Sequence, residues 1–262
     1  MYFYYFIIQF SYNFLEHNAV QPSIMYNLIK HSCDQKYGIV SQCFKADYIN
    51  EQPGGYFENL LLKVNGKIGG QNIVVNPQVL NELPFNYKRT MILGVDVNHP
   101  GATEKVLSSI AVAVGSYDPL FTYYSASIRI QKKERDEMIR QMDSMVEELL
   151  EEYKKKNNQY PENLFIFRDG VSEGQFDKVE NIEIPLIQKM INKLGKKIKL
   201  TLVVVQKRHH TRFVRLEVDS SQRRPTYNVP SGTVVDQGIV EPNKKIFYLN
   251  SHFSPLVSSK KM

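Results

Sequence analysis

Three segments rich in Val, Ile and Tyr follow one another in the middle of the chain, and this run constrains the fold most. They cover residues 91–97, 108–115 and 122–131, and turns bearing Pro, Gly or Asp separate them. After them, a helical pattern, a strand, a second helical pattern and a second strand alternate. A three-stranded meander followed by such crossovers predicts an α/β fold, a mixed sheet with helices on its faces.

Periodicity defines the helices of this region. Residues 133–157 place apolar side chains three to four positions apart, which predicts an amphipathic helix; these are Met138, Met142, Met145, Leu149 and Tyr153. Residues 173–194 predict a second helix despite Pro185. Strands are predicted at 163–167, 198–206 and 246–249.

The first third of the chain has a mixed pattern. A helix is expected over residues 23–31, a short strand over 38–42 and an amphipathic helix over 56–67, while residues 1–20 match no element. The stretch 81–89 contains Pro84 and no clear period, so it is interpreted as a connector. We therefore expect a partial α/β domain at residues 1–84 and a second domain at 85–262.

Charge and composition exclude some classes of protein. The chain carries 33 Lys and Arg against 27 Asp and Glu, a net charge of +6, which favours a polyanionic partner only weakly. No apolar run is long enough to span a bilayer, so no membrane partner is expected. The two cysteines, Cys33 and Cys43, form no CxxC pair and indicate neither a disulfide framework nor a zinc site.

Acidic residues stand where an α/β protein places its chemistry. Asp96 ends the first strand of the meander region, Asp169 follows the strand 163–167, and Glu137 opens the long helix. If the two strands are neighbours, their carboxylates could hold Mg²⁺, which prefers oxygen ligands. The alternative is that each aspartate only caps a turn or a helix, and spacing alone favours that reading.

Three stretches of sequence decide between these readings: residues 94–100 (GVDVNHP), 168–176 (RDGVSEGQF) and 205–212 (VQKRHHTR). In this order they closely resemble the signature stretches of the PIWI domain of eukaryotic Argonaute proteins. Further matches lie at 110–116, 229–236 and 247–252, so the resemblance covers roughly Tyr26 to His252. It implies a ribonuclease H-like PIWI domain preceded by the C-terminal part of a MID domain, truncated at both ends.

The resemblance also implies a catalytic site. Slicing members of the family use an Asp-Glu-Asp-His tetrad with Mg²⁺, and Asp96, Glu137 and Asp169 match its first three members, with Asp96 and Asp169 as metal ligands. Mn²⁺ is the alternative ion. The fourth member, a histidine, belongs to a segment after the Ser-His run, and no histidine follows His252. His252 and His99 match motif positions outside the tetrad.

Guide-binding positions are implied in the same way. Residues that match the family's clamp for the guide 5′-phosphate are Tyr26, Lys30, Gln42, Lys63 and Lys67, with the tyrosine stacked on the first base. Residues that match its contacts to the guide backbone are Lys207, His210 and Arg212. Without the resemblance, these basic residues would be read as solvated side chains on helices and a turn.

The expected function is therefore RNA-guided gene silencing. Its partners would be a small guide RNA, a complementary target RNA and proteins of a silencing complex, in the cytoplasm, with the nucleus left open. Because the histidine is unmatched, three alternatives stay open. They are Mg²⁺-dependent cleavage of the target, a non-cleaving guide-binding module and an inert truncated fragment.

Overall fold

The structure is a computed structural model that describes residues 22–44, 47–51, 54–101, 108–131, 136–207, 209–219 and 226–252. The chain divides into two compact units, Met1–Gln206 and Lys207–Met262, which are described separately. The boundary expected near residue 84 falls inside the first unit and stays a prediction.

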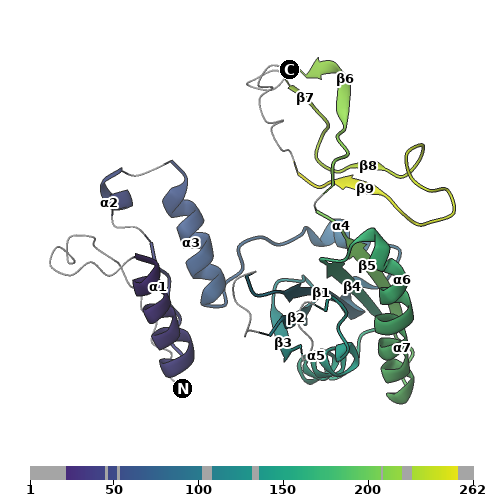
Figure 1. Cartoon of the computed structure of the whole chain (residues 1–262), viewed down its shortest axis with the longest axis horizontal. Helices are drawn as coiled ribbons and strands as arrows, with labels where there is room; N and C mark the ends of the chain where they lie inside the picture. The colour runs from purple at the N-terminus through teal and green to yellow at the C-terminus, as the bar shows by residue number, and fades with distance from the viewer. Residues whose placement is uncertain are drawn as a thin grey trace. The chain divides into compact units, whose positions relative to one another are not determined.

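Helices are the regular structure of the N-terminal part of the first unit among its described residues. It contains α1 (Pro22–Lys30), the π-helix His31–Tyr37, α2 (Asp47–Glu51), α3 (Tyr56–Lys67), α4 (Pro77–Asn81) and the 3₁₀-helix Tyr87–Arg89 (Figure 1). The helices expected at 23–31 and 56–67 are confirmed. The strand expected at 38–42 is wrong, because those residues have no regular structure. Gly38, at φ +62°, ends the π-helix in a left-handed cap.

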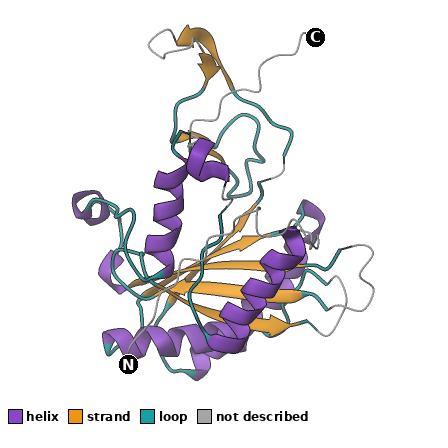
Figure 2. Cartoon of the chain, turned by 90° about the vertical axis from the view of Figure 1, so that its left-hand side faces the viewer, coloured by secondary structure: helices purple, strands orange, loops and turns teal. Residues whose placement is uncertain are grey.

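A five-stranded sheet forms the centre of the first unit, in the order β3-β2-β1-β4-β5. Its strands are β1 (Thr90–Asn98), β2 (Ile110–Ser116), β3 (Tyr124–Ile130), β4 (Asn163–Asp169) and β5 (Lys199–Val205). The meander β1-β2-β3 is antiparallel, whereas β4 runs parallel to both β1 and β5. Figure 2 shows these strands side by side with helices packed across them. The predicted mixed α/β architecture is confirmed.

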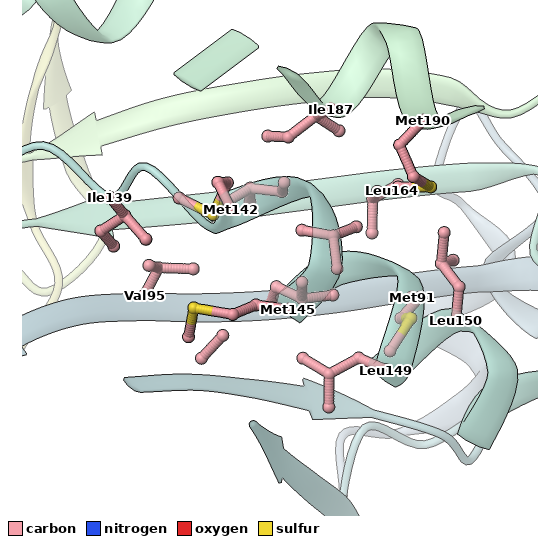
Figure 3. Packing of buried hydrophobic residues seen from close by; sticks show 14 of the residues in the cluster. Met91, Val95, Ile139, Met142, Met145, Leu149, Leu150, Leu164, Ile187 and Met190 are labelled. Carbon is pink, nitrogen blue, oxygen red and sulfur yellow. The ribbon is translucent and has the colours of Figure 1, made fainter. Parts of the chain in front are cut away.

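Alternation along the strands explains how the core is filled. In β1, Met91, Leu93, Val95 and Val97 are buried while Gly94 and Asp96 are exposed, as period-two side chains require. The buried face packs against α5 (Met142–Asn157) and α7 (Ile184–Lys193), whose apolar stripes supply most of the remaining core (Figure 3). Asp96 therefore points to the face that these helices leave uncovered.

Both long helices of this region differ in part from expectation. The start expected at residue 133 lies outside the described residues; residues 136–141 form a loop and α5 begins at Met142, so Glu137 does not open the helix. The helix expected over 173–194 is confirmed in its extent, because residues 173–193 are helical without a break, but its geometry changes along the way: a 3₁₀ turn, α6 (Phe176–Lys178) and the π-helix Val179–Glu183 precede α7. Pro185 is the second residue of α7, directly after the π-helix, and it has no N–H to donate to the preceding turn.

The second unit consists of two small antiparallel sheets. β6 (Val214–Asp219) pairs with β7 (Thr226–Asn228), and β8 (Thr233–Val235) pairs with β9 (Tyr248–Asn250). The strand expected at 246–249 is confirmed as β9, with its start shifted by two residues, whereas β6, β7 and β8 were not expected. Among the described residues, no helix has the length and apolar composition needed to cross a bilayer.

Candidate active site and phosphate site

Two aspartates lie side by side at one end of the sheet. β1 and β4 are parallel, and Val95 pairs with Arg168, so the next step along both strands brings Asp96 beside Asp169. Both side chains leave the sheet on the face opposite Val95 and Arg168, which are buried. The condition set in the sequence analysis, that the two strands are neighbours, is therefore met.

Gly170 leaves an open space beside two of the acidic side chains, Asp96 and Glu137. It has φ +86°, and a Cβ built there would lie 3.3 Å from Asp96 Oδ1 and 3.5 Å from Glu137 Oε2. Each aspartate is anchored locally, because Val97 N–H donates to Asp96 Oδ1 at 2.9 Å and Gly170 N–H donates to Asp169 Oδ1 at 2.9 Å. The glycine thus forms the floor of a cradle lined by carboxylates.

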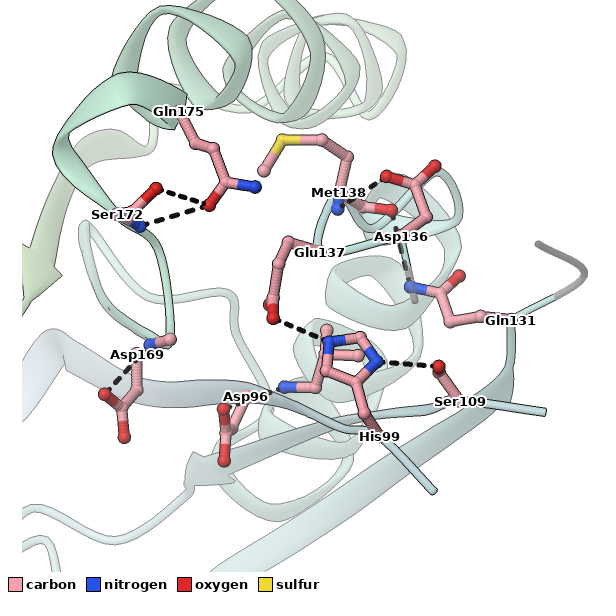
Figure 4. A network of polar contacts seen from close by, with 12 residues as sticks. Asp96, His99, Ser109, Gln131, Asp136, Glu137, Met138, Asp169, Ser172 and Gln175 are labelled. Atoms are coloured by element: carbon pink, nitrogen blue, oxygen red, sulfur yellow. Dashed lines mark hydrogen bonds and ion pairs between the residues drawn. The ribbon is translucent and has the colours of Figure 1, made fainter. Parts of the chain in front are cut away.

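Glu137 reaches this cradle from the loop before α5. Its Oε1 lies 2.6 Å from His99 Nε2, and the other ring nitrogen of His99 lies 2.7 Å from Ser109 Oγ (Figure 4). Its Oε2 is buried and has no hydrogen-bond partner among the described residues. One carboxylate oxygen is therefore held in place, and the other remains available to a ligand.

A second cluster gathers two lysines on one carbonyl. Lys30 Nζ, from the end of α1, donates to the Ser41 carbonyl at 2.9 Å and to Ser41 Oγ at 2.8 Å. Lys67 Nζ, from the end of α3, donates to the same carbonyl at 2.8 Å and to Gln42 Oε1 at 2.8 Å. Three of the five expected phosphate-site residues, Lys30, Gln42 and Lys67, are thus brought together.

The charges of this cluster are only partly balanced. Desolvation, followed by the nearby Lys30 ammonium, lowers the pKa of Lys67. The nearest carboxylate to Lys30 is Asp34, at 3.9 Å. Burial raises the pKa of the neighbouring Cys43 thiol, and both lysines oppose that shift. Two cations at one position form a site suited to an anion.

The other two expected phosphate-site residues stand apart from this cluster. Tyr26 lies one turn before Lys30 on α1, and Lys63 one turn before Lys67 on α3; both are exposed. Within the described residues, no side-chain hydrogen bond or ion pair joins either of them to Lys30, Gln42 or Lys67. Their predicted roles remain predictions.

The expected guide-backbone residues fall in the second unit, in the loop before β6. His210 and Arg212 are exposed, and Arg212 Nη1 donates to the carbonyls of His209 and Thr211 at 2.8 and 2.9 Å. Lys207 begins the same loop and is exposed as well. The loop therefore displays three basic side chains.

Comparison with known proteins identifies the family of the chain. The Piwi domain family matches residues 15–260. The chain belongs to the Argonaute family. Argonaute 2 of Oryza sativa subsp. japonica is 39% identical over 232 residues, and argonaute-2 of Drosophila melanogaster is 38% identical over 236 residues. These stretches cover 87% and 88% of this chain but 22% and 19% of the relatives, so the chain spans about a fifth of their length.

Solved structures agree with the Argonaute fold. The crystal structure of Kluyveromyces polysporus Argonaute with a guide RNA superposes with a TM-score of 0.72 at 30% identity, over 85% of this chain and 28% of that one. The C-terminal lobe of a budding yeast Argonaute gives a TM-score of 0.72 at 29% identity, over 85% of this chain and 46% of that one. The expected ribonuclease H-like fold is confirmed.

The acidic side chains of this Argonaute chain fit a hard divalent cation by their chemistry. All are carboxylates, one oxygen of Glu137 is buried without a partner, and the space beside it would be filled by a Cβ at Gly170. As the side chains lie, no group of three His, Cys, Asp or Glu among the described residues is gathered closely enough to hold an ion. Binding would therefore require Asp96, Glu137 and Asp169 to converge.

Sequence reasoning missed three residues around the Argonaute acidic site. His99 was assigned to the motif scaffold, yet it holds Glu137. The sequence indicates Arg168 only as part of a matching stretch and gives no signal for Glu183, yet both side chains are completely buried and bind the backbone next to the site. The signal in the sequence is the strand alternation of β4. It places Arg168 on the buried face of the strand and its neighbours, Phe167 and Asp169, on the other face.

Proposed function

We propose that this chain is the part of an Argonaute that holds a small guide RNA by its 5′-phosphate during RNA-guided silencing. The observation that carries the proposal is the pair of ammonium groups, Lys30 and Lys67, both turned onto the Ser41 carbonyl. Phosphate oxygens accept charge-assisted hydrogen bonds more strongly than a neutral carbonyl does. The similar crystal structure of Kluyveromyces polysporus Argonaute with a guide RNA supports the proposal.

The remaining guide contacts follow from the same proposal. Tyr26 is an exposed aromatic ring one turn from Lys30, and an aromatic face stacks on any base without sequence choice. Lys63 would add charge to the phosphate site. Lys207, His210 and Arg212 would follow the guide backbone, and base pairing with the guide would select the target RNA.

The test compares two guides that differ only at the 5′ end. A guide with a 5′-phosphate should bind the full chain more tightly than a guide with a 5′-hydroxyl, measured by fluorescence anisotropy. The Lys67→Met variant should lose that difference, while Lys193→Met, which removes an equal charge at the end of α7, should keep it. Equal affinity of the parent chain for both guides would refute phosphate clamping.

Cleavage of the paired target is the second proposed activity. The observation that favours it is the position of Glu137, which His99 holds by one carboxylate oxygen while the other is buried without a partner among the described residues. Asp96, Asp169 and Glu137 would hold Mg²⁺, with Mn²⁺ as the alternative. A bound divalent cation supplies Lewis-acid activation of the phosphodiester and of water. His99 fixes Glu137 Oε1, and the Ser109 hydroxyl orients the imidazole, so that Oε2, which has no partner among the described residues, stays beside Gly170.

The cleavage test uses a 5′-phosphorylated guide and a labelled complementary RNA. Asp96→Asn and Asp169→Asn should each abolish Mg²⁺-dependent cleavage, whereas Asp177→Asn, an exposed carboxylate on α6, should leave it unchanged. If the parent chain binds the guide and does not cut, the non-cleaving silencing module is the better description. If the chain shows no cooperative unfolding transition, the inert truncated fragment is the better description.

A further inference from the structure

We propose that the buried ion pair of Arg168 and Glu183 is a positioning device for the acidic site, setting where the backbones of Asp169 and Glu137 lie relative to each other. The inference rests on the proposed metal-dependent cleavage. It assigns a role to two residues that touch neither an RNA nor a metal ion. Both act through the residues that carry the carboxylates.

The guanidinium of Arg168 is shared between a carboxylate and two carbonyls. Arg168 Nε donates to Glu183 Oε2 at 3.1 Å, and Nη2 donates to Glu183 Oε1 at 3.1 Å. Nη1 also donates to the carbonyl of Asp169, and Nη2 to the carbonyl of Glu137. One rigid, planar group therefore joins the end of β4 to the loop before α5.

Glu183 binds the same loop through a second contact. Its Oε1 accepts the backbone N–H of Ile139 at 2.9 Å, two residues beyond Glu137. The loop of residues 136–141 has no helix or strand hydrogen bonds of its own in its first four residues. The ion pair thus binds both a carbonyl and an N–H of the segment that presents Glu137.

Stability alone does not account for this pair. Both side chains have 0% exposure, and removing two charges from water costs several kcal/mol per ion before any attraction offsets it. Packed apolar residues of similar volume often give equal stability. They would, however, leave the carbonyls of Asp169 and Glu137 without this shared donor, and these are the two residues whose side chains must meet.

A metal site is sensitive to such placement. Ligand distances must hold within about 0.2 Å for a given ion, and groups that orient ligands change affinity by about tenfold or more. Because Arg168 lies between the two backbones, a shift of the guanidinium moves both carboxylates relative to Asp96. The proposal therefore predicts a loss of metal affinity from substitutions that leave all three carboxylates intact.

The experiment measures Mn²⁺ binding to the full chain by electron paramagnetic resonance, without RNA. Glu183→Gln and Arg168→Lys should each weaken Mn²⁺ binding by about tenfold or more. The matched control is Glu162→Gln, which breaks the 2.8 Å ion pair with Arg89 at the opposite end of β4 and should leave affinity unchanged. Unchanged affinity in both test variants would overturn the proposal.

Two further readouts keep the test independent of folding and of the proposed cleavage. Arg168→Met combined with Glu183→Leu removes both charges and should fold, yet bind Mn²⁺ more weakly; parental affinity in this variant also overturns the proposal. Amide hydrogen exchange at Ile139 and Gly170 should accelerate in Glu183→Gln more than global stability requires. If the parent chain binds no Mn²⁺, the proposed cleavage fails, and the exchange rates alone decide the positioning role.

In a guide-loaded cleavage assay, the positioning role predicts a specific kinetic change. The kcat of Glu183→Gln should fall while the KM for target RNA stays at the parental value, because the RNA contacts are untouched. A rise in KM with constant kcat would contradict it.

Discussion

Gly170 offers the sharpest test of the acidic cradle, because one methyl group probes it directly. At φ +86° the Gly170→Ala variant must hold an L-residue in a left-handed conformation, which costs about 1–2 kcal/mol. In a chain of this size, that corresponds to a loss of about 2–4 °C in Tm for each kcal/mol. The new Cβ would also lie 3.3 Å from Asp96 Oδ1 and 3.5 Å from Glu137 Oε2, at or inside van der Waals contact.

Gly195→Ala separates the two effects. Gly195, in the turn after α7, has φ +63°, and a Cβ there meets no atom within 4 Å. The two variants should therefore lose similar stability in urea unfolding. Only Gly170→Ala should weaken Mn²⁺ binding, by about tenfold or more, because its methyl group occupies the space into which the carboxylates must converge.

The reasoning has two clear points of failure. If Gly170→Ala binds Mn²⁺ as the parent does, the carboxylates do not use the space beside Gly170, and the candidate site is misplaced. If Gly195→Ala weakens Mn²⁺ binding to the same degree, the effect comes from general destabilisation. Measuring both variants on one stability scale distinguishes these results.

Three other predictions concern stability and pH. Leu149→Ala removes a side chain that is 0% exposed at the centre of α5 and should destabilise the fold by about 2–5 kcal/mol, measured in urea, whereas Leu61→Ala, 63% exposed on α3, should change little. Desolvation and Lys30 lower the pKa of Lys67, so the charged form of Lys67 is less favourable in the folded state than in the unfolded state. The free energy of unfolding, measured in urea, should therefore rise as pH approaches the ordinary value of 10.5. Lys67→Met should lack that rise, while Lys193→Met should keep it. The pKa of Glu148 is lowered by the Ser127 hydroxyl and then by Arg129, so its contribution is present above the ordinary value of 4.5 and is lost as pH falls below it. Glu148→Gln should flatten that acid dependence of the urea midpoint, and a curve identical to that of the parent would contradict the assignment.

The central sheet could be predicted because its strands follow a simple rule. β1 to β5 alternate or run apolar between turn residues, and each is long enough for that pattern to be read. The strand predicted for the short run 38–42 was wrong, because five residues are too few for the pattern to be decisive. The run contains Gly38 in a left-handed helix cap, and the residues after it bind Lys30 and Lys67 through Ser41 and Gln42 instead of pairing with a strand.

The start of α5 could not be predicted from the sequence because contacts to distant residues set it. Residues 133–157 carry a helical period, yet residues 136–141 are not helical, because the carbonyl of Glu137 and the N–H of Ile139 bind Arg168 and Glu183 instead of helical partners. No local pattern encodes contacts to residues more than thirty positions away. The same holds for His99, whose contact with Glu137 could not be read from spacing.

The stretch Arg168-Asp169-Gly170 shows how three consecutive residues can serve one site by pointing in different directions. Strand alternation sends Arg168 into the core, where Glu183 neutralises it, and sends Asp169 out beside Asp96. Gly170 then turns with positive φ and leaves room where any other residue would place a Cβ. Each role depends on its neighbours: without the buried arginine the carbonyl of Asp169 loses its donor, and without the glycine the carboxylates lose the space between them. This physical coupling explains why matching these residues as a run is more informative about the site than matching any of them alone.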